Sequence, residues 1–120
     1  MKKKLFFSAI AGVMFFGNTA LAATSSATIT SSMTGADGAE YYMTGYDTIS
    51  GANYTSSSND LYVEAYHTVT GPDELKSSTR LGPGASLNKS INPGNGYFYV
   101  HLDPAGAYER GCNGWGKLTD

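Results

Sequence analysis

Tyrosine and histidine are the side chains of this sequence best suited to surface chemistry. The chain has nine tyrosines and two histidines. A tyrosine ring gives rigid, amphipathic contact area at small entropic cost, and it is enriched where proteins bind proteins or stack on sugar rings. An imidazole can act as a general base or as a metal ligand. The strands that carry these residues therefore determine which of the side chains lie together on one surface.

Most of the tyrosines fall in segments where apolar and polar residues alternate, which predicts β-strands with one outward face. The residues predicted to point outward, and so the candidate binding residues, are Tyr42, Tyr46, Tyr62, Tyr66, Tyr97, Tyr99 and His101. If their strands are neighbours, these side chains form one tyrosine-rich surface for a protein or a glycan. The competing interpretation is that aromatic residues simply favour strands and pair across them.

The two histidines are predicted to lie on opposite faces of the sheet. His67 alternates in phase with Leu61 and Val63, which is typical of a histidine in the core or at its rim. His101 alternates in phase with Tyr97 and Tyr99, and it is the better surface candidate. A site shared by both imidazoles is therefore not expected, and we expect no metal and no cofactor.

Sequence motifs of catalysis are absent from the chain. It has no G-x-S-x-G, no H-E-x-x-H, no Walker A sequence, and no G-x-G-x-x-G fingerprint between a strand and a helix. We therefore expect a protein that is not an enzyme and has no catalytic residues.

The clearest strand pattern runs from Leu61 to Thr70. One face would carry Leu61, Val63, Ala65, His67 and Val69, and the other Tyr62, Glu64, Tyr66, Thr68 and Thr70. A turn is predicted at Gly71-Pro72-Asp73-Glu74, because proline presets φ and aspartate bonds nearby backbone groups. A hairpin to a strand at 75–81 follows.

Turn signals divide the rest of the chain into short strands. Gly82-Pro83-Gly84 and 92–96 are strong turns, with strands predicted beside them at 85–91 and 97–102. Further strands are predicted at about 27–33, 39–47 and 107–112, the longest loop at 48–60, and a Gly-rich tail after residue 112. This pattern is typical of an all-β fold, a small antiparallel β-sandwich or barrel of six to seven short strands. The predicted core contains Ile29, Met43, Leu61, Val63, Val69, Phe98, Val100 and Leu102.

The first 22 residues have the pattern of a secretory signal peptide. Three lysines at 2–4 precede an apolar run from Leu5 to Phe16, and Ala20-Leu21-Ala22 closes the segment. The apolar run is shorter than the roughly 20 residues of a membrane-spanning helix. We therefore expect a signal peptide at 1–22 and a single all-β domain at 23–120, extracellular or, in a two-membrane bacterium, periplasmic, without a membrane anchor.

Charge excludes two classes of partner. Residues 23–120 carry five Lys or Arg against ten Asp or Glu, which gives a net charge of about −5. Such a domain lacks the basic cluster that binds phosphate backbones, so nucleic acid is not an expected partner. Anionic membrane surfaces are disfavoured for the same reason.

The only cysteine, Cys112, cannot form an intrachain disulfide. Three states stay open for it: a buried hydrophobic side chain, a half-cystine between two chains that would make a homo-oligomer, and a free reactive thiol. Its sequence neighbours include no His or Lys that would lower its pKa, and cysteine is among the most often buried residue types. The buried state is therefore favoured.

One family resemblance rests on the C-terminal half. Pro83-Gly84, Gly96-Tyr97 and a Tyr-x-x-x-Cys ending at 108–112 occur in an order similar to that of the small secreted α-amylase inhibitors of the tendamistat type. The Trp-Arg-Tyr inhibitory triplet of that family is absent, and three of its four cysteines have no counterpart. The resemblance therefore transfers no functional residue. Small secreted bacteriocins of β-sandwich type are similar in length, without a matching motif.

Three functions fit these observations. The first is a secreted non-catalytic binding protein, an inhibitor or a binder of a surface protein or glycan, which acts through the tyrosine-rich sheet face. The second is a secreted antibacterial toxin or bacteriocin. The third is a structural or matrix component that assembles through Cys112 or exposed strands.

Overall fold

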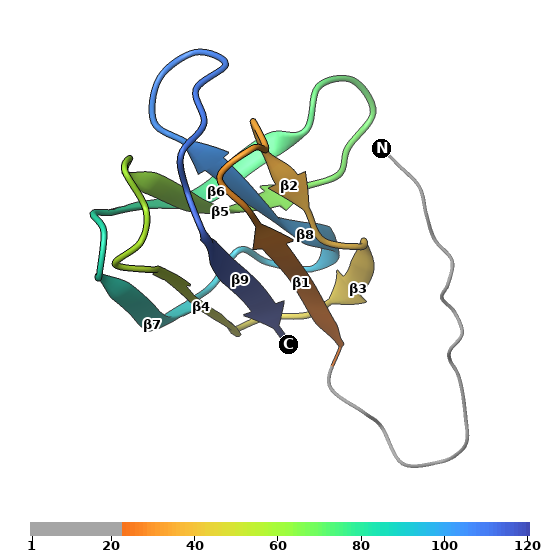
Figure 1. Cartoon of the computed structure of the whole chain (residues 1–120). Coiled ribbons are helices and arrows are strands. Elements are labelled where there is room, and N and C mark those ends of the chain that lie inside the picture. The colour runs from red at the N-terminus through yellow and green to blue at the C-terminus, as the bar shows by residue number, and fades with distance from the viewer. Residues whose placement is uncertain (1–22) are drawn as a thin grey trace.

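The fold is a β-sandwich built from two antiparallel sheets (Figure 1). The computed structural model describes residues 23–120, so the predicted signal peptide lies outside the described residues. No helix in the described part of the chain is long and apolar enough to cross a membrane. The prediction of an all-β antiparallel fold is confirmed. Of the two predicted architectures, sandwich and barrel, the structure has the sandwich.

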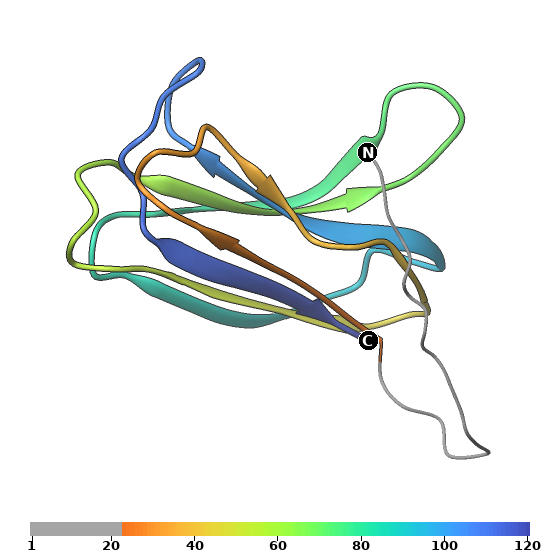
Figure 2. The same ribbon diagram turned by 45° about the vertical axis from the view of Figure 1, so that its right-hand side comes forward.

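Each sheet combines strands from both halves of the chain. In the four-stranded sheet the order is β1 (Thr24–Ile29), β9 (Gly114–Thr119), β4 (Asp47–Asn53) and β7 (Ser86–Ile91). In the five-stranded sheet the order is β2 (Ala36–Asp37), β8 (Gly96–Pro104), β5 (Leu61–His67) and β6 (Glu74–Leu81), and β3 (Tyr41–Met43) also pairs with β8. Figure 2 shows the two sheets as separate layers.

Strands β5 and β8 supply half of the buried hydrophobic residues of the core. Val63 lies opposite Leu102, and Ala65 lies opposite Val100. All four side chains are completely buried between the sheets, so their sequence neighbours point away from the core. Of the predicted core residues only Val69 is not fully buried: it follows the end of β5 and is half-buried.

Two glycines bring the four-stranded sheet close to this core. Gly51 of β4 and Gly116 of β9 are paired across their strands. A β carbon on Gly116 would lie 2.7 Å from Leu102 Cδ2, and one on Gly51 would lie 3.2 Å from Val63 Cγ2, both in the other sheet. Glycine in a strand interior often marks such a close approach. The spacing between the sheets thus depends on the absence of side chains at these two positions.

The C-terminal prediction was wrong in one important respect. The segment predicted as a Gly-rich tail contains β9, which lies between β1 and β4 and pairs with both. Gly114, Gly116 and Leu118 point inward in alternation, and glycines at inward positions hide the apolar pattern by which strands are recognised. The predicted strand at 107–112 is instead a loop.

Other strand boundaries also differ from the sequence prediction. Nine strands are present in residues 23–120, compared with the six or seven expected. The predicted loop at 48–60 begins within β4, where Asp47, Ile49, Gly51 and Asn53 are buried in alternation. Their mixed polarity hid the period of two. The predicted strand at 39–47 is only three residues long, because the chain crosses after β3 to the other sheet.

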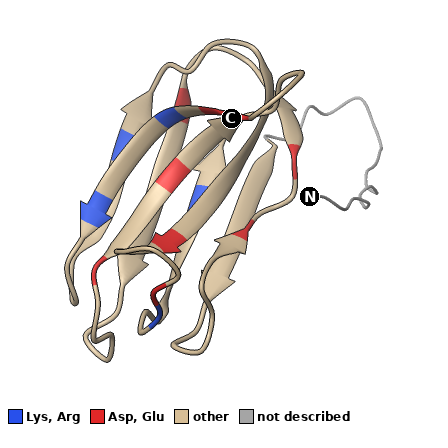
Figure 3. Cartoon of the chain, turned by 90° about the horizontal axis from the view of Figure 1, so that it is seen from above, with Lys and Arg blue, Asp and Glu red and all other residues tan. Residues whose placement is uncertain are grey.

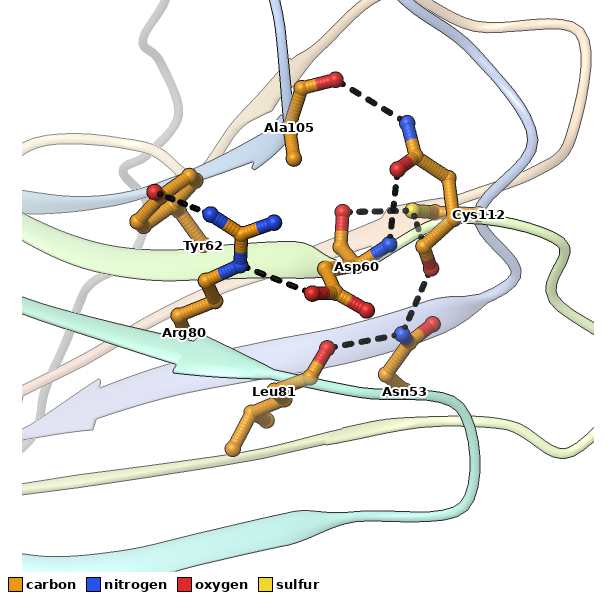
Figure 4. A network of polar contacts seen from close by, with 8 residues as sticks. Asn53, Asp60, Tyr62, Arg80, Leu81, Ala105 and Cys112 are labelled. Carbon is orange, nitrogen blue, oxygen red and sulfur yellow. Dashed lines mark hydrogen bonds and ion pairs between the residues drawn. The ribbon is translucent and has the colours of Figure 1, made fainter.

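A hydrogen-bond network holds the loop between β4 and β5 (Figure 4). The buried side-chain amide of Asn53 donates to the backbone oxygens of Asn59 and Leu81, at 2.9 Å each. Asn59 in turn donates to the backbone oxygen of Ala105 at 3.0 Å. Buried polar groups satisfied in this way fix a loop, because breaking one bond leaves the other group without a partner.

Candidate binding face

The outer surface of the five-stranded sheet collects five of the tyrosines. We call it the tyrosine face and define it by Tyr42, Tyr62, Tyr66, Tyr97, Tyr99 and His101. The register explains the grouping: Tyr42 lies opposite Tyr97, and Tyr66 lies opposite Tyr99. Because side chains on one face of a sheet recur every second residue, β8 also places His101 on this surface.

The rings of the tyrosine face contact one another across the strands. Tyr66 and Tyr99 are stacked, with ring centroids 5.7 Å apart and planes 13° apart. Tyr42 and Tyr97 meet edge to face at 5.3 Å. Aromatic pairs of this kind contribute about 0.5–1.5 kcal/mol beyond their burial. The rings are therefore held in place by contacts within the chain, although Tyr42 and Tyr97 are each 53% exposed.

Tyr99 is also fixed through its hydroxyl. The phenol donates a hydrogen bond of 2.6 Å to Asp73 Oδ2. Burial, that hydrogen bond and the surrounding negative charges raise the pKa of Tyr99 well above its ordinary value. Burial and the carboxylates of Glu64 and Asp103 likewise raise the pKa of Tyr66. Both phenols are therefore uncharged donors at neutral pH.

At the β6 side of the face, Tyr62 lies beside Arg80. The Arg80 guanidinium donates to Tyr62 Oη at 3.1 Å and to Asp60 Oδ2 at 2.7 Å (Figure 4). Its central carbon lies 5.5 Å from the Tyr62 ring centroid. A cation near an aromatic ring in this range is attracted by the ring quadrupole. Arg80 is thus engaged with groups of its own chain.

Outside the edge strand β6, which carries Lys76 and Arg80, this sheet has acidic residues and no Lys or Arg. Strands β2, β3, β5 and β8 contain Asp37, Glu64 and Asp103, and no Lys or Arg. Glu64 lies opposite His101, and Asp37 lies opposite His101 on its other side. Figure 3 shows acidic residues distributed over strands and loops of the molecule. The tyrosine face is therefore aromatic and acidic at once.

His101 lies among these carboxylates. Its Nδ1 is hydrogen-bonded to Asp37 Oδ1, and its ring meets the Tyr66 ring edge to face at 5.6 Å. Burial alone would lower the pKa of His101. The hydrogen bond to Asp37 and the negative charges of Asp37, Glu64 and Asp103 outweigh burial and raise that pKa above its ordinary value.

Tyr46 is the candidate residue that the structure does not bring to this sheet. It lies in the connection between β3 and β4, outside any strand, and its side chain is 72% exposed. The chain reverses at Gly45, whose φ is +64° and whose amide donates to Asn95 Oδ1. The strand alternation that would have aligned Tyr46 with Tyr42 ends at that point.

The two histidines lie on opposite faces, as predicted. His67 stacks on the buried ring of Phe98, with centroids 4.7 Å apart. Its Nδ1 lies 3.3 Å from Glu74 Oε1, and that contact together with Lys76 lowers the pKa of Glu74. His67 thus occupies the rim of the core, the position that its sequence pattern indicates.

Sequence reasoning missed the carboxylates around His101. One nitrogen of His101 and one oxygen each of Glu64 and Asp103 lie within 4.8 Å of one another. The spacing His101-x-Asp103 on a predicted strand is a signal that could have been noticed, since it puts both residues on one face. Glu64 could not have been added without the register between β5 and β8.

Cys112 is completely buried and unpaired. Its thiol donates to the backbone oxygens of Asn59 and Asp60, at 3.4 Å and 3.3 Å. Burial, with the negative charges of Asp60 and Asp103, raises the pKa of Cys112, so the reactive thiolate is disfavoured. The buried state favoured by the sequence is the one observed.

No protein-family model, no curated protein and no solved structure matches this chain.

Proposed function

We propose that this chain is a secreted, non-catalytic binding protein. Its tyrosine face binds a partner protein by contacting exposed Lys and Arg side chains of that partner. The observation that carries the proposal is the position of the tyrosines. Register on three neighbouring strands gathers five rings on one surface, and two of them, Tyr42 and Tyr97, remain half exposed. Tyrosine is enriched at protein interfaces because a rigid ring gives large contact area at small entropic cost.

Charge complementarity indicates the chemistry of the partner. Asp37 and Asp103 accompany the tyrosines, and the strands that carry them contain no Lys or Arg. Arg80, at the edge of the face, is already bonded to Asp60 and Tyr62. Opposite charge across an interface speeds association and suppresses wrong partners, and cations also bind over tyrosine rings. A surface rich in Lys or Arg fits both features.

The packing of the rings favours a protein over a glycan. Sugars stack on an open ring face, whereas Tyr66 and Tyr99 cover one face of each other. Tyr42 and Tyr97 meet edge to face, which presents a rough aromatic surface. Such a surface suits interdigitating side chains.

A capture experiment with matched variants tests the proposal. The purified protein is immobilised and exposed to the secreted and cell-surface proteins of its source organism. The bait is the wild type, the double variant Tyr42→Ser/Tyr97→Ser, or Tyr54→Ser. Tyr54 is a matched control because it is 49% exposed and follows β4 in the other sheet. We expect one partner to be retained by the wild type and by Tyr54→Ser, and retained at least tenfold less by the double variant.

Two further treatments test the class of partner. Raising NaCl from about 0.1 M to about 1 M shortens the Debye length from about 10 Å to about 3 Å, so we expect it to release the partner. Removing glycans from the partner should change nothing. Equal capture by the double variant contradicts the role of the tyrosine face. Loss of capture after deglycosylation contradicts a protein epitope.

A further inference from the structure

A group of three metal-ligand side chains lies beside the tyrosines. Glu64 comes from β5, and His101 and Asp103 come from β8, where the register sets Glu64 directly opposite His101. One ligand atom from each residue lies within 4.8 Å of the other two. The three residues contribute one nitrogen and two oxygen donors. Two adjacent, fully paired strands of the sheet therefore hold all three ligands.

Glu64 is the member whose position needs explaining. Its exposure is only 8%, although carboxylates are almost never so buried unless they are paired. The hydrogen bond to its side chain in the described residues comes from Ser78, to Oε2 at 2.8 Å. No Lys or Arg forms an ion pair with it there. Within residues 23–120 the other carboxylate oxygen, Oε1, has no protein donor, and it is not among the fully buried oxygens, so it remains accessible to a ligand from solvent.

The orientation of His101 is a second, independent observation. Its Nδ1 is held by Asp37, which comes from β2 and is not one of the three grouped residues. Histidines that bind metals almost always use one ring nitrogen for the metal and give the other N–H to a carboxylate or carbonyl. In the neutral ring, a proton on Nδ1 shared with Asp37 leaves Nε2 as the free ligand nitrogen.

We propose that Glu64, His101 and Asp103 bind one divalent transition-metal ion of the Zn²⁺ type, with Asp37 as the residue that orients His101. A mixed nitrogen and carboxylate set suits Zn²⁺, whereas Ca²⁺ takes six to eight oxygen ligands. Ligand atoms around a tetrahedral zinc lie roughly 3.4 Å apart, given bonds of about 2.0–2.1 Å. The side chains must therefore approach one another by up to about 1.4 Å when the ion binds.

Three protein ligands leave the fourth position of a tetrahedral ion open. That position would face the same surface as Tyr66 and Tyr99, so a water molecule or a donor group from another molecule can fill it. The site does not depend on the proposed partner protein, because its three protein ligands all belong to this chain.

Calorimetric titration with ZnCl₂ at pH 7 tests the site on the purified protein, without a polyhistidine tag. We expect one Zn²⁺ per chain and no binding of CaCl₂ under the same conditions. His101→Gln and Asp103→Asn should each weaken Zn²⁺ binding at least tenfold. Asp37→Asn should weaken it about 10–100-fold, as substitutions of such orienting residues do. The matched control is His67→Gln, since His67 also lies beside a carboxylate, Glu74, but on the opposite side of the sheet.

Each variant is first checked by thermal unfolding, and Asp103→Asn, at a half-exposed position, replaces His101→Gln if the latter fails to fold. Binding of Co²⁺, followed by its visible absorption, gives a readout of the ligand set that is independent of heat. Absence of saturable Zn²⁺ binding to the wild type overturns the proposal. So does binding that survives His101→Gln and is lost in His67→Gln, because that result would assign the ion to the His67 and Glu74 pair.

Discussion

Tyr66 and Tyr99 stack across β5 and β8, and the hydroxyl of Tyr99 donates to Asp73 beyond the end of the stack. Asp73 lies in the loop before β6, so this hydrogen bond connects the loop to the centre of the sheet. The stacked pair and the loop before β6 are therefore connected, and these contacts within the chain stabilise the tyrosine face.

Replacing the Tyr99 hydroxyl should destabilise the fold. Tyr99→Phe keeps the stacked ring but removes the donor to Asp73, and hydrogen bonds to charged groups contribute about 1.5–3 kcal/mol. Because this site is only partly buried, we expect a loss of about 1 kcal/mol in the free energy of unfolding, measured by urea denaturation at pH 7. Tyr97→Phe is the control, since Tyr97 is 53% exposed and its hydroxyl has no such partner among residues 23–120. Equal effects of the two variants would show that the Asp73 bond contributes nothing.

Stability should depend on pH through Asp47. This carboxyl is 2% exposed and its two oxygens have no hydrogen-bond partner in residues 23–120, and burial, together with the nearby carboxylate of Asp120, raises its pKa from 3.8 to about 7. The folded state therefore holds a proton that the unfolded chain releases, so the contribution of Asp47 is fully present below about pH 4 and is lost as the pH rises towards 7.

Asp47→Asn isolates that contribution. The amide stays neutral at every pH, so no charge is buried beside Asp120, and we expect it to stabilise the protein by on the order of 1 kcal/mol at pH 8. Below pH 4 the variant and the wild type should unfold alike. Melting temperatures measured from pH 3 to pH 8 check this. A constant difference across the range would mean that Asp47 does not titrate in it.

The close approach at Gly116 should make even one added methyl group costly. A β carbon there would lie 2.7 Å from Leu102 Cδ2 and 3.2 Å from Val63 Cγ1, both in completely buried side chains. Overpacking of this kind costs about 1–3 kcal/mol, so Gly116→Ala should lower the free energy of unfolding by that amount. The adjacent Lys117 points outward, and Lys117→Ala should stay within about 0.5 kcal/mol. A neutral Gly116→Ala would show that the two sheets can separate to accept the methyl group.

The thiol of Cys112 should react slowly in the native protein. It is buried against the loop that carries Asn59 and Asp60, and its raised pKa disfavours the thiolate. We expect labelling by a thiol reagent to require opening of this loop, and to become fast and stoichiometric only in denaturant. Rapid labelling without denaturant would contradict the buried position and support assembly of two chains through this cysteine.

The sequence predicted the five-stranded sheet better than the four-stranded one, for a physical reason. In β5 and β8 large apolar residues alternate with tyrosines, so Val63 and Phe98 mark the inner face clearly. In β4 and β9 the inward positions include Asp47, Gly51 and Gly116, which have no apolar pattern. The two glycines are small because Val63 and Leu102 of the other sheet already fill the space beside them.

The candidate site could be predicted only in part. Alternation along single strands gave the outward direction of Tyr66, Tyr99 and His101, because that property is local. The cluster of Glu64 with His101 depends on the register of β5 against β8, and Asp37 depends on the pairing of a two-residue strand. Neither pairing leaves a local signal in the sequence. Tyr46 was misplaced because one glycine turns the chain towards the other sheet.

The most direct test of the tyrosine face is a nitration footprint of the protein with and without its captured partner. Tyr42, Tyr97 and Tyr54 have nearly equal exposure, at 53%, 53% and 49%, so their reaction rates in the free protein should be comparable. Mass spectrometry of the nitrated peptides should show Tyr42 and Tyr97 protected by the partner while Tyr54 reacts as before. Protection of Tyr54 with unchanged reaction of Tyr42 and Tyr97 would contradict binding through this face.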